Sequence, residues 1–314
     1  MDQLVRDVAS LWTAGRRVER VCYAIAGALI LSGFAHLAVY AVDGGPWEGP
    51  VSWRKAVTFG LSFGITLVSV CWVARFVPLG SRTRTWLLGA LAVASVAEVA
   101  LVTLQCWRGV PSHFNDETPF DAAVMRTLAV GGLVLFVTLG WLTVAAARPA
   151  PGTPASMRLA VRVGLGTLMA SLMVGGVMIA GGVTSVAAGD RQGAYLHGGW
   201  LKPAHAVLLH AVTVLPVLAW LASYTTWSEA RRVRLVTAGA VSYLTAATAV
   251  IIGTVVSGLI DTATLTGDTA LVAGETLVAT AGVITLVAVL AVLSGFVVTF
   301  ADLARRARQT GAGV

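Results

Sequence analysis

The side chains in this sequence that could ligate an iron or move a proton are mainly its histidines. They are His36, His113, His197, His205 and His210. Imidazole ligates haem iron and other metals, and it exchanges protons near neutral pH. His36 and His210 lie in different apolar segments, so the two rings could ligate one haem iron from opposite sides. His113 and His205 are candidates for acid–base catalysis, and hydrogen-bonded packing is the alternative for each ring.

A zinc site of the metalloprotease type is not favoured by the histidine spacing. His205 and His210 are five residues apart, which corresponds to about 140° around a helix. Two histidines four residues apart, as in HExxH, share one helix face and can bind one ion together. The identity of any bound metal is therefore left open by the sequence.

The only lysines among the 22 basic residues are Lys55 and Lys202, and each follows a tryptophan by two residues. The pattern is typical of an anchor at a membrane surface, where tryptophan prefers the headgroups and lysine extends toward water. Arginine would serve equally well as an anchor, whereas lysine is a compact point charge. The alternative is that Lys55 and Lys202, together with Arg108, flank a site and receive haem propionates or a small anionic solute.

Glu98 is an ionisable residue inside a long apolar run, and such residues are usually functional. Gln105 lies seven residues further on, on the same helix face, and Arg108 follows three residues later. Glu98 is a candidate for acid–base catalysis, and a structural ion pair with Arg126 is the alternative. Glu98, His36 and His210 lie at similar depth in their apolar runs. Each is roughly 9–14 Å from the end that faces away from the basic segments, at 1.5 Å per residue.

The composition is that of an integral membrane protein. Hydrophobic residues make up 57% of the chain and charged residues only 12%, with a mean hydropathy of +0.81, whereas a soluble domain carries roughly 25% charge. The apolar runs are long enough for helices that cross a bilayer, and they lack the alternation of a barrel. We therefore predict an all-α membrane protein with eight transmembrane helices, at residues 21–42, 56–77, 85–107, 121–147, 159–182, 203–223, 234–259 and 272–300.

Positive charges are concentrated in alternate segments between these runs. The basic segments contain Arg6, Arg16, Arg17, Arg20, Arg75, Arg82, Arg84, Arg148, Arg158, Arg162, Arg231, Arg232, Arg234, Arg305, Arg306 and Arg308. The opposite loops contain Arg54, Lys55, Arg108, Arg191 and Lys202. The positive-inside rule then places both termini in the cytoplasm, which also accounts for the net charge of +7 without nucleic acid as a partner.

An internal repeat is suggested by the two tryptophan–lysine pairs. A shift of 147 residues brings Trp53 onto Trp200 and Lys55 onto Lys202, and it superimposes the first four predicted helices on the last four. Two halves with an even number of spans would be parallel repeats, related by an axis along the membrane normal. The predicted parts are a cytoplasmic or interfacial segment (1–20), a first repeat (21–147), a linker (148–158), a second repeat (159–300) and a cytoplasmic tail (301–314).

One polar loop carries the motifs QCWRGVPSHFN and TPFD, and the start of the sixth predicted span carries LKPAHAVLLHAVTVLP. In these motifs the chain resembles a family of bacterial multi-pass membrane proteins that share S-H-F-N, T-P-F-D and A-H-x4-H. The family has W-x-K-P near its second span, where this chain has Ala56 after Lys55. The resemblance covers roughly the first six spans and implies a place in the bacterial plasma membrane, but it implies no activity. The T-P-F-D motif itself predicts a helix that begins near Pro119.

Two classes of function follow from these residues. The first is a membrane oxidoreductase that binds haem or a metal ion through His36 and His210 and reacts with a small or lipophilic redox partner. The second is a transporter or receptor for a small anionic solute, for which paired basic groups and parallel repeats are suited. A cofactor-independent enzyme that uses Glu98 or a histidine for proton transfer is a third possibility. The histidines lie on the side opposite the basic segments, so any site is expected to open to the extracytoplasmic side.

Overall fold

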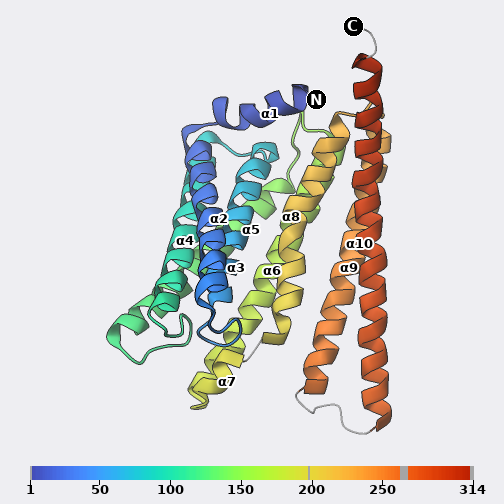
Figure 1. Cartoon of the computed structure of the whole chain (residues 1–314). Helices are drawn as coiled ribbons and strands as arrows, with labels where there is room; N and C mark the ends of the chain where they lie inside the picture. Colours follow the sequence, from blue (N-terminus) through green and yellow to red (C-terminus); the bar gives the residue numbers. More distant parts are fainter. Residues whose placement is uncertain (1, 197–198, 262–267, 312–314) are drawn as a thin grey trace. The chain divides into compact units, whose positions relative to one another are not determined.

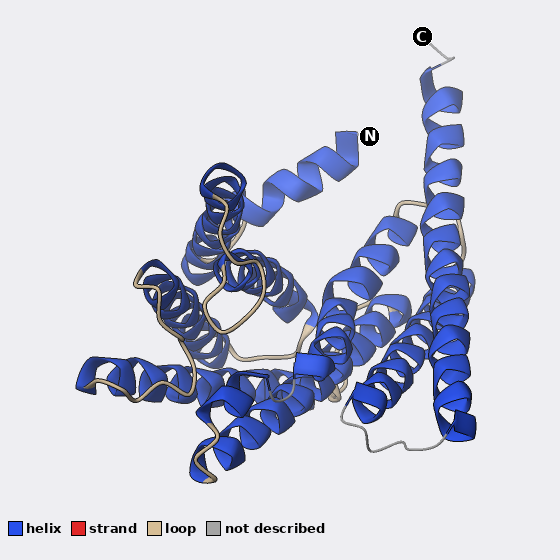
Figure 2. Ribbon diagram, turned by 60° about the horizontal axis from the view of Figure 1, so that its bottom comes forward, coloured by secondary structure: helices blue, strands red, loops and turns tan. Residues whose placement is uncertain are grey.

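The computed structural model of the protein describes residues 2–196, 199–261 and 268–311, and these are helical with short connections and no strand (Figures 1 and 2). Eight of the described helices are long and apolar enough to cross a membrane, which confirms the predicted number. The helices in chain order are α1 (Asp2–Thr13), α2 (Arg17–Asp43), α3 (Trp53–Val73), α4 (Ser81–Trp107), α5 (Pro119–Ala146), α6 (Ala155–Ala187), α7 (Arg191–Leu196), α8 (Lys202–Ser223), α9 (Glu229–Asp261) and α10 (Asp268–Gly311).

Several helices extend beyond the predicted apolar runs. α6 continues five residues past the run that ends at 182, and α10 continues through most of the predicted tail to Gly311. Hydropathy marks only the apolar part of a helix, whereas backbone hydrogen bonding continues into the polar flanks until a cap or a glycine ends it. Helix α1 falls inside the predicted interfacial segment, and its location at a membrane surface stays a prediction.

The contacts of the chain group it into two units. The α2–α5 unit comprises Val8–Arg148 and Gly176–Gly199, and the α8–α10 unit comprises Met1–Asp7, Pro149–Gly175 and Trp200–Val314. Helix α6 therefore contributes its first part to one unit and its last part to the other. Both tryptophan–lysine pairs occupy equivalent local positions, because Trp53 and Lys55 begin α3 while Trp200 and Lys202 lie at the start of α8. The internal repeat and the orientation in the membrane stay predictions.

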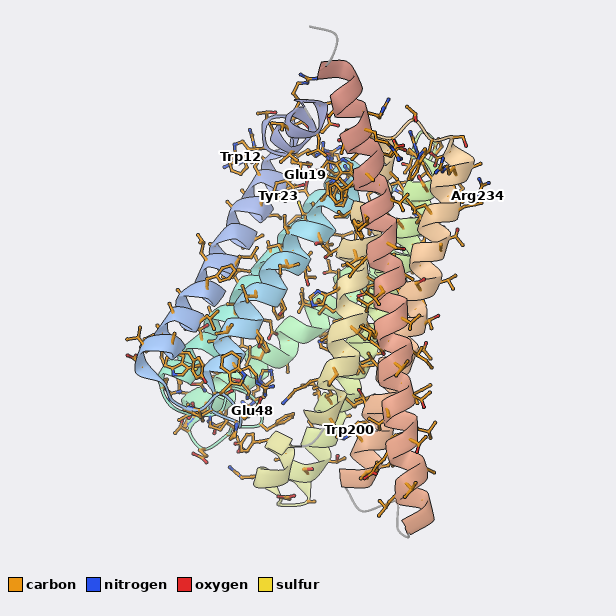
Figure 3. All side chains as sticks on the ribbon, turned by 45° about the vertical axis from the view of Figure 1, so that its right-hand side comes forward. Trp12, Glu19, Tyr23, Glu48, Trp200 and Arg234 are labelled. Atoms are coloured by element: carbon orange, nitrogen blue, oxygen red, sulfur yellow. The ribbon has the colours of Figure 1, made fainter. Side chains whose placement is uncertain are left out.

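In the α2–α5 unit, helices α2 and α3 approach each other at glycines. A Cβ on Gly60 would lie 2.6 Å from the backbone nitrogen of Gly33, and a Cβ on Gly64 would lie 2.8 Å from the carbonyl oxygen of Ala26. Gly60 and Gly64 form the small-xxx-small pattern that allows helix backbones in membranes to pack in close contact. Helix α4 packs against α2, α3 and α5. Glu19 and Tyr23 mark one end of α2, and Glu48 follows its other end (Figure 3).

In the α8–α10 unit, α9 runs beside both α8 and α10 (Figure 1). Trp200 packs on Gly258 near one end of α9, and Arg234 lies toward the other end (Figure 3). The Glu229 side chain accepts a hydrogen bond of 2.8 Å from the backbone N–H of Ser156, which ties the start of α9 to the start of α6. This unit carries His205, His210 and Lys202 on one helix, α8.

Candidate functional site

One end of the α2–α5 unit brings together four of the predicted site residues. His36 comes from the last turns of α2, Lys55 from the first turn of α3, Arg108 from the end of α4, and His113 from the loop between α4 and α5. We call these four residues, with the loop 108–118, the loop-end cluster. The fifth predicted residue of this unit, Glu98, lies deeper along α4. The predicted residues of α8 belong to the other unit.

His36 uses both of its ring nitrogens in hydrogen bonds. Its Nδ1 lies 2.7 Å from the carbonyl oxygen of Ser32, and its Nε2 lies 3.0 Å from the indole Nε1 of Trp107. A carbonyl only accepts and an indole N–H only donates, so His36 carries its proton on Nδ1. Its ring also packs against Trp53 and Trp107, with 6.1 Å between centroids in each case. In this arrangement His36 has no nitrogen available for an iron.

Lys55 turns back toward the loop that precedes α3. Its Nζ donates a hydrogen bond of 2.9 Å to the carbonyl oxygen of Pro50, and the side chain is half-buried. Its neighbour Arg54 forms an ion pair of 2.8 Å with Glu48. Lys55 also lies close enough to Cys106 and His113 for its charge to act on both groups. Lys55 is thus part of the loop-end cluster.

His113 is a neutral imidazole packed among aromatic rings. Burial, together with the positive charge of Lys55, lowers the pKa of His113 to about 4. Its Nδ1 lies 2.9 Å from the hydroxyl of Ser112, and its ring centroid lies 6.1 Å from that of Phe59. His113 therefore carries no charge near neutral pH. An anion brought next to it and Lys55 would favour its protonated form.

The S-H-F-N motif is explained by the fold of the loop that carries it. Phe114 has a φ of +58°, a conformation that is strained for a bulky side chain. Its ring packs directly on Gly182 of α6, where a Cβ would lie 2.2 Å from the ring. Asn115 is buried, donates to the carbonyl of Pro111 and accepts from the backbone N–H of Glu117. Nothing in the amino-acid pattern indicates that Phe114 is strained or that its ring packs on Gly182.

The T-P-F-D motif caps α5 as predicted and also supplies a partner for Arg108. The hydroxyl of Thr118 accepts from the backbone N–H of Asp121 at 3.1 Å and donates to its carboxylate at 2.6 Å. Asp121 also accepts from Gln105 at 2.8 Å and pairs with Arg108 at 2.5 Å. Arg108 further packs over the ring of Phe120. An anion that binds Arg108 would compete with a buried carboxylate that already compensates its charge.

Glu98 does not form the predicted ion pair with Arg126. Glu98 is 5% exposed and faces α5 at Gly131, whereas Arg126 is exposed on the surface of α5. No hydrogen bond or ion pair of Glu98 occurs within residues 2–196, 199–261 and 268–311. The prediction failed because sequence distance from a helix end gives depth, but it does not give the direction in which a side chain points.

On α8, His205 and His210 are both partly buried and Lys202 is exposed. The Nδ1 of His205 lies 2.8 Å from the carbonyl oxygen of Ser171, whose hydroxyl donates to the carbonyl of His205 at 2.7 Å. The Nδ1 of His205 therefore carries a proton, and no hydrogen bond in the described residues engages its Nε2. A cavity shared by His36 and His210, and the convergence of Lys202 with Lys55, would join the two units, so both stay predictions. His197 lies outside the described residues.

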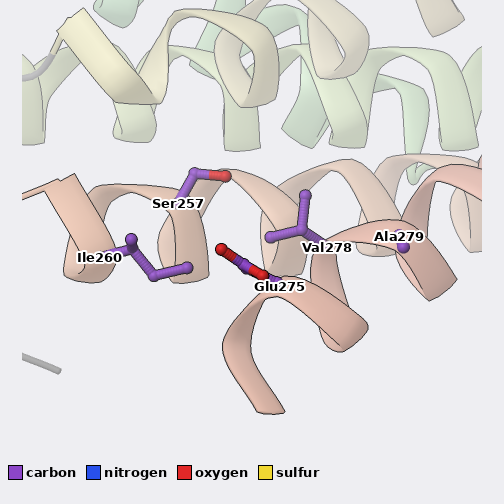
Figure 4. Close-up of a pocket in the computed structure, with 5 residues that line it drawn as sticks. All are labelled: Ser257, Ile260, Glu275, Val278 and Ala279. Carbon is purple, nitrogen blue, oxygen red and sulfur yellow. The ribbon is translucent and has the colours of Figure 1, made fainter. Parts of the chain in front are cut away.

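The described residues outside the loop-end cluster form no comparable site. Among the described residues, no three histidine, cysteine, aspartate or glutamate side chains are grouped so that they could hold a metal ion. A groove between α9 and α10 is lined by Ser257, Ile260, Glu275, Val278 and Ala279 (Figure 4). It is open and mainly apolar, with Glu275 as its one charged lining residue. The loop-end cluster is thus the strongest candidate site in the described part of the chain.

Comparison with known proteins adds no relative from which a role could be transferred. No protein-family model, no curated protein and no solved structure matches the chain. The function of this polytopic, all-helical membrane protein is therefore inferred from the side chains of the loop-end cluster.

Proposed function

We propose that this membrane protein binds a small anionic solute at the loop-end cluster, as a transporter or a receptor. The observation that carries the proposal is the position of Lys55. The charge of Lys55 lies among aromatic and imidazole groups. Together with burial, this charge lowers the pKa of the His113 imidazole to about 4. A solute anion next to Lys55 would interact with a compact cation and with an imidazole that gains a proton in its presence.

The position of Lys55 on α3 supports the proposal. Arg54 and Lys55 occupy the first turn of α3, which contains no acidic residue. The N-terminus of a helix carries a partial positive charge, so cations there are disfavoured and anions are attracted. Arg54 is paired with Glu48, so Lys55 is the basic residue that adds to the positive potential of this helix end. An anionic ligand would relieve the repulsion between Lys55 and the helix N-terminus.

The first test of the proposal replaces the lysine itself. We expect acetate, chloride or inorganic phosphate, at constant ionic strength, to raise the unfolding temperature of the detergent-purified protein, because a ligand that binds only the folded state stabilises it. Lys55→Gln should abolish this rise, and Lys55→Arg should reduce it, because a guanidinium is larger and less strongly hydrated.

Lys202→Gln is the matched control, since Lys202 occupies the equivalent position at the start of α8 but is exposed. The control should retain the response to the anion. If Lys55→Gln responds to all three anions as the unsubstituted protein does, Lys55 is an anchor and the anion site lies elsewhere or does not exist.

The affinity for the anion should increase as the pH falls from about 6.5 toward 4. The free protein holds His113 neutral down to about pH 4, and a bound anion raises the pKa of the imidazole, so binding takes up a proton in this interval. Isothermal titration calorimetry in buffers of different ionisation enthalpy measures this uptake. His113→Gln should remove both the proton uptake and the pH dependence, and an unchanged pH profile in that variant would exclude His113 from the site.

A haem- or metal-binding oxidoreductase is the second candidate, and His205 is the observation that favours it. A histidine ligand usually donates its other ring nitrogen to a carbonyl or carboxylate, as His205 does to Ser171. The engaged nitrogens of His36 weigh against the pair of ligands predicted from the sequence. The visible absorption spectrum and metal content of the purified protein distinguish this candidate from the first.

A further inference from the structure

Glu98 is a buried carboxyl group in the membrane-spanning part of the α2–α5 unit. It lies nine residues before the end of α4 and is 5% exposed. Its Oε1 occupies the space above Gly131 of α5, 2.5 Å from where a Cβ on that residue would lie. The glycine therefore leaves room for the carboxyl group at the contact between the two helices.

Apolar residues separate Glu98 from the polar groups of the loop-end cluster. Val102, Val124 and Leu128 form a buried cluster between α4 and α5, with Phe59 and Leu101 packed against it. This layer lies between Glu98 and Gln105 along α4. On the other side of Glu98, the hydroxyl of Ser95 donates to the carbonyl of Leu91. The carboxyl group of Glu98 thus lies within an apolar section of the helix contact.

The charged and titratable groups of the helices packed on α4 lie toward its two ends. Those near the loop end are His36, Tyr40, Asp43, Arg54, Lys55 and Asp121, with Cys106 and Arg108 on α4 itself, and those near the other end are Arg17, Glu19, Arg20, Cys22, Tyr23 and Cys71, with Arg82 and Arg84 on α4. Arg126 of α5 is nearer, five residues before Gly131, but its side chain is exposed. His36 bonds to Trp107, nine residues beyond Glu98, and Cys22 bonds to the carbonyl of Leu88, ten residues before it. Each level is roughly 14 Å from Glu98 along the helix axis.

An ionised carboxylate is strongly disfavoured in such surroundings. It would lack both the water and the cation or N–H donors that stabilise a buried negative charge. A protonated carboxyl group avoids most of this cost, and a buried, unpaired acid in a membrane protein is typical of a proton pathway. We propose that Glu98 is a proton-binding site, which holds its proton in the conformation described here and releases it when water or a cation reaches the α4–α5 contact.

This inference goes beyond the anion site and does not depend on it. The first experiment compares infrared spectra of the unsubstituted protein and of Glu98→Gln in lipid at neutral pH. We expect the carbonyl-stretch band of one protonated carboxylic acid in the difference spectrum. Gln has the shape of a protonated Glu, so the variant should fold with nearly the same unfolding temperature. Carboxylate bands in place of the acid band would overturn the proposal.

The second experiment tests exchange of the proton with dicyclohexylcarbodiimide, which reacts with protonated carboxyl groups inside membranes. The carboxyl oxygen bonds to the central carbon of the reagent, the proton passes to one of its nitrogens, and acyl migration leaves a stable N-acylurea with no leaving group. Mass spectrometry should find the adduct on Glu98, with a labelling rate that falls as the pH rises. Labelling that sodium ions suppress at fixed pH would identify a metal-ion site and overturn the proposal.

Glu19 is the matched internal control for the labelling. It is as deeply buried as Glu98, at 2% exposed, but it accepts from the backbone N–H of Arg16 and lies 3.9 Å from Arg84. Because a backbone N–H and a nearby guanidinium already interact with its carboxyl group, Glu19 should stay unlabelled under conditions that modify Glu98. Equal labelling of Glu19 and Glu98 would show that burial alone decides reactivity, and would also overturn the assignment. An unchanged response to anions in Glu98→Gln separates this site from the one near Lys55.

Discussion

Replacing Gly60 by alanine is expected to destabilise the α2–α5 unit strongly, because it forces α2 and α3 apart. A Cβ at this position would lie 2.6 Å from the backbone nitrogen of Gly33 and 2.9 Å from the carbonyl oxygen of Leu29. Both atoms belong to the backbone of α2, so no side chain can rotate away and the helices must separate. Overpacking typically costs about 1–3 kcal/mol, and loss of the surrounding helix contact adds to it.

Gly27→Ala on α2 is the control for this prediction. A Cβ there would meet nothing within 4 Å, so alanine should leave stability unchanged or raise it, by up to about 1 kcal/mol from helix propensity. The measurement is unfolding of both variants by titration with sodium dodecyl sulfate in mixed micelles. Equal unfolding midpoints for Gly60→Ala and Gly27→Ala would show that α2 and α3 are not packed at their glycines as described.

Gly182→Ala is expected to release the loop 108–118 from α6. The added Cβ would lie 2.2 to 2.7 Å from three atoms at the tip of the Phe114 ring, so the ring must move away from α6. The backbone of Phe114 is held at positive φ. Displacing Phe114 also relaxes that strain, which offsets about 1–3 kcal/mol of the overpacking cost. The substitution should therefore mainly make loop 108–118 less ordered, and it should lower the stability of the whole protein to a smaller extent.

Hydrogen exchange of the backbone amides measures this effect. In Gly182→Ala the amides of residues 112–117 should exchange much faster, because the ion pair of 3.0 Å between Asp116 and Arg191 is lost together with the ring contact. The response to small anions should weaken as well, since His113 adjoins Phe114. Gly176→Ala, on the same helix with nothing within 4 Å of its Cβ, should behave as the unsubstituted protein. If the amides of residues 112–117 exchange as slowly in Gly182→Ala as in the unsubstituted protein, the Phe114 ring does not pack on α6 as described.

Combining Gly182→Ala with Phe114→Ala gives an independent check. If the methyl group and the ring collide, the double variant should be more stable than the sum of the two single changes predicts, because the small side chain removes the collision. Strict additivity would mean that the two residues do not touch.

The helices of this protein could be predicted from sequence because they depend on local properties. A run of about 20 apolar residues needs no distant partner to become a transmembrane helix, since the bilayer excludes any backbone that is not internally hydrogen-bonded. The same locality explains why the start of α5 was predicted: the hydroxyl of Thr118 and the N–H of Asp121 are three residues apart. The apolar run likewise predicts a helix from residue 56, and α3 begins three residues earlier, at Trp53.

The roles of the polar residues depended on partners far away in the sequence. His36 qualified as a ligand by its type and depth, yet its Nε2 is occupied by Trp107, 71 residues further on. Depth alone makes Arg126 a partner for Glu98, but the α4–α5 contact turns Glu98 toward Gly131 and leaves Arg126 exposed. The hydropathy pattern specifies that a helix forms and how long it is. Tertiary packing, such as the close contact of Gly60 with Gly33, decides which face of the helix meets a neighbour. This packing in turn determines which nitrogens, carboxylates and cations remain available for chemistry.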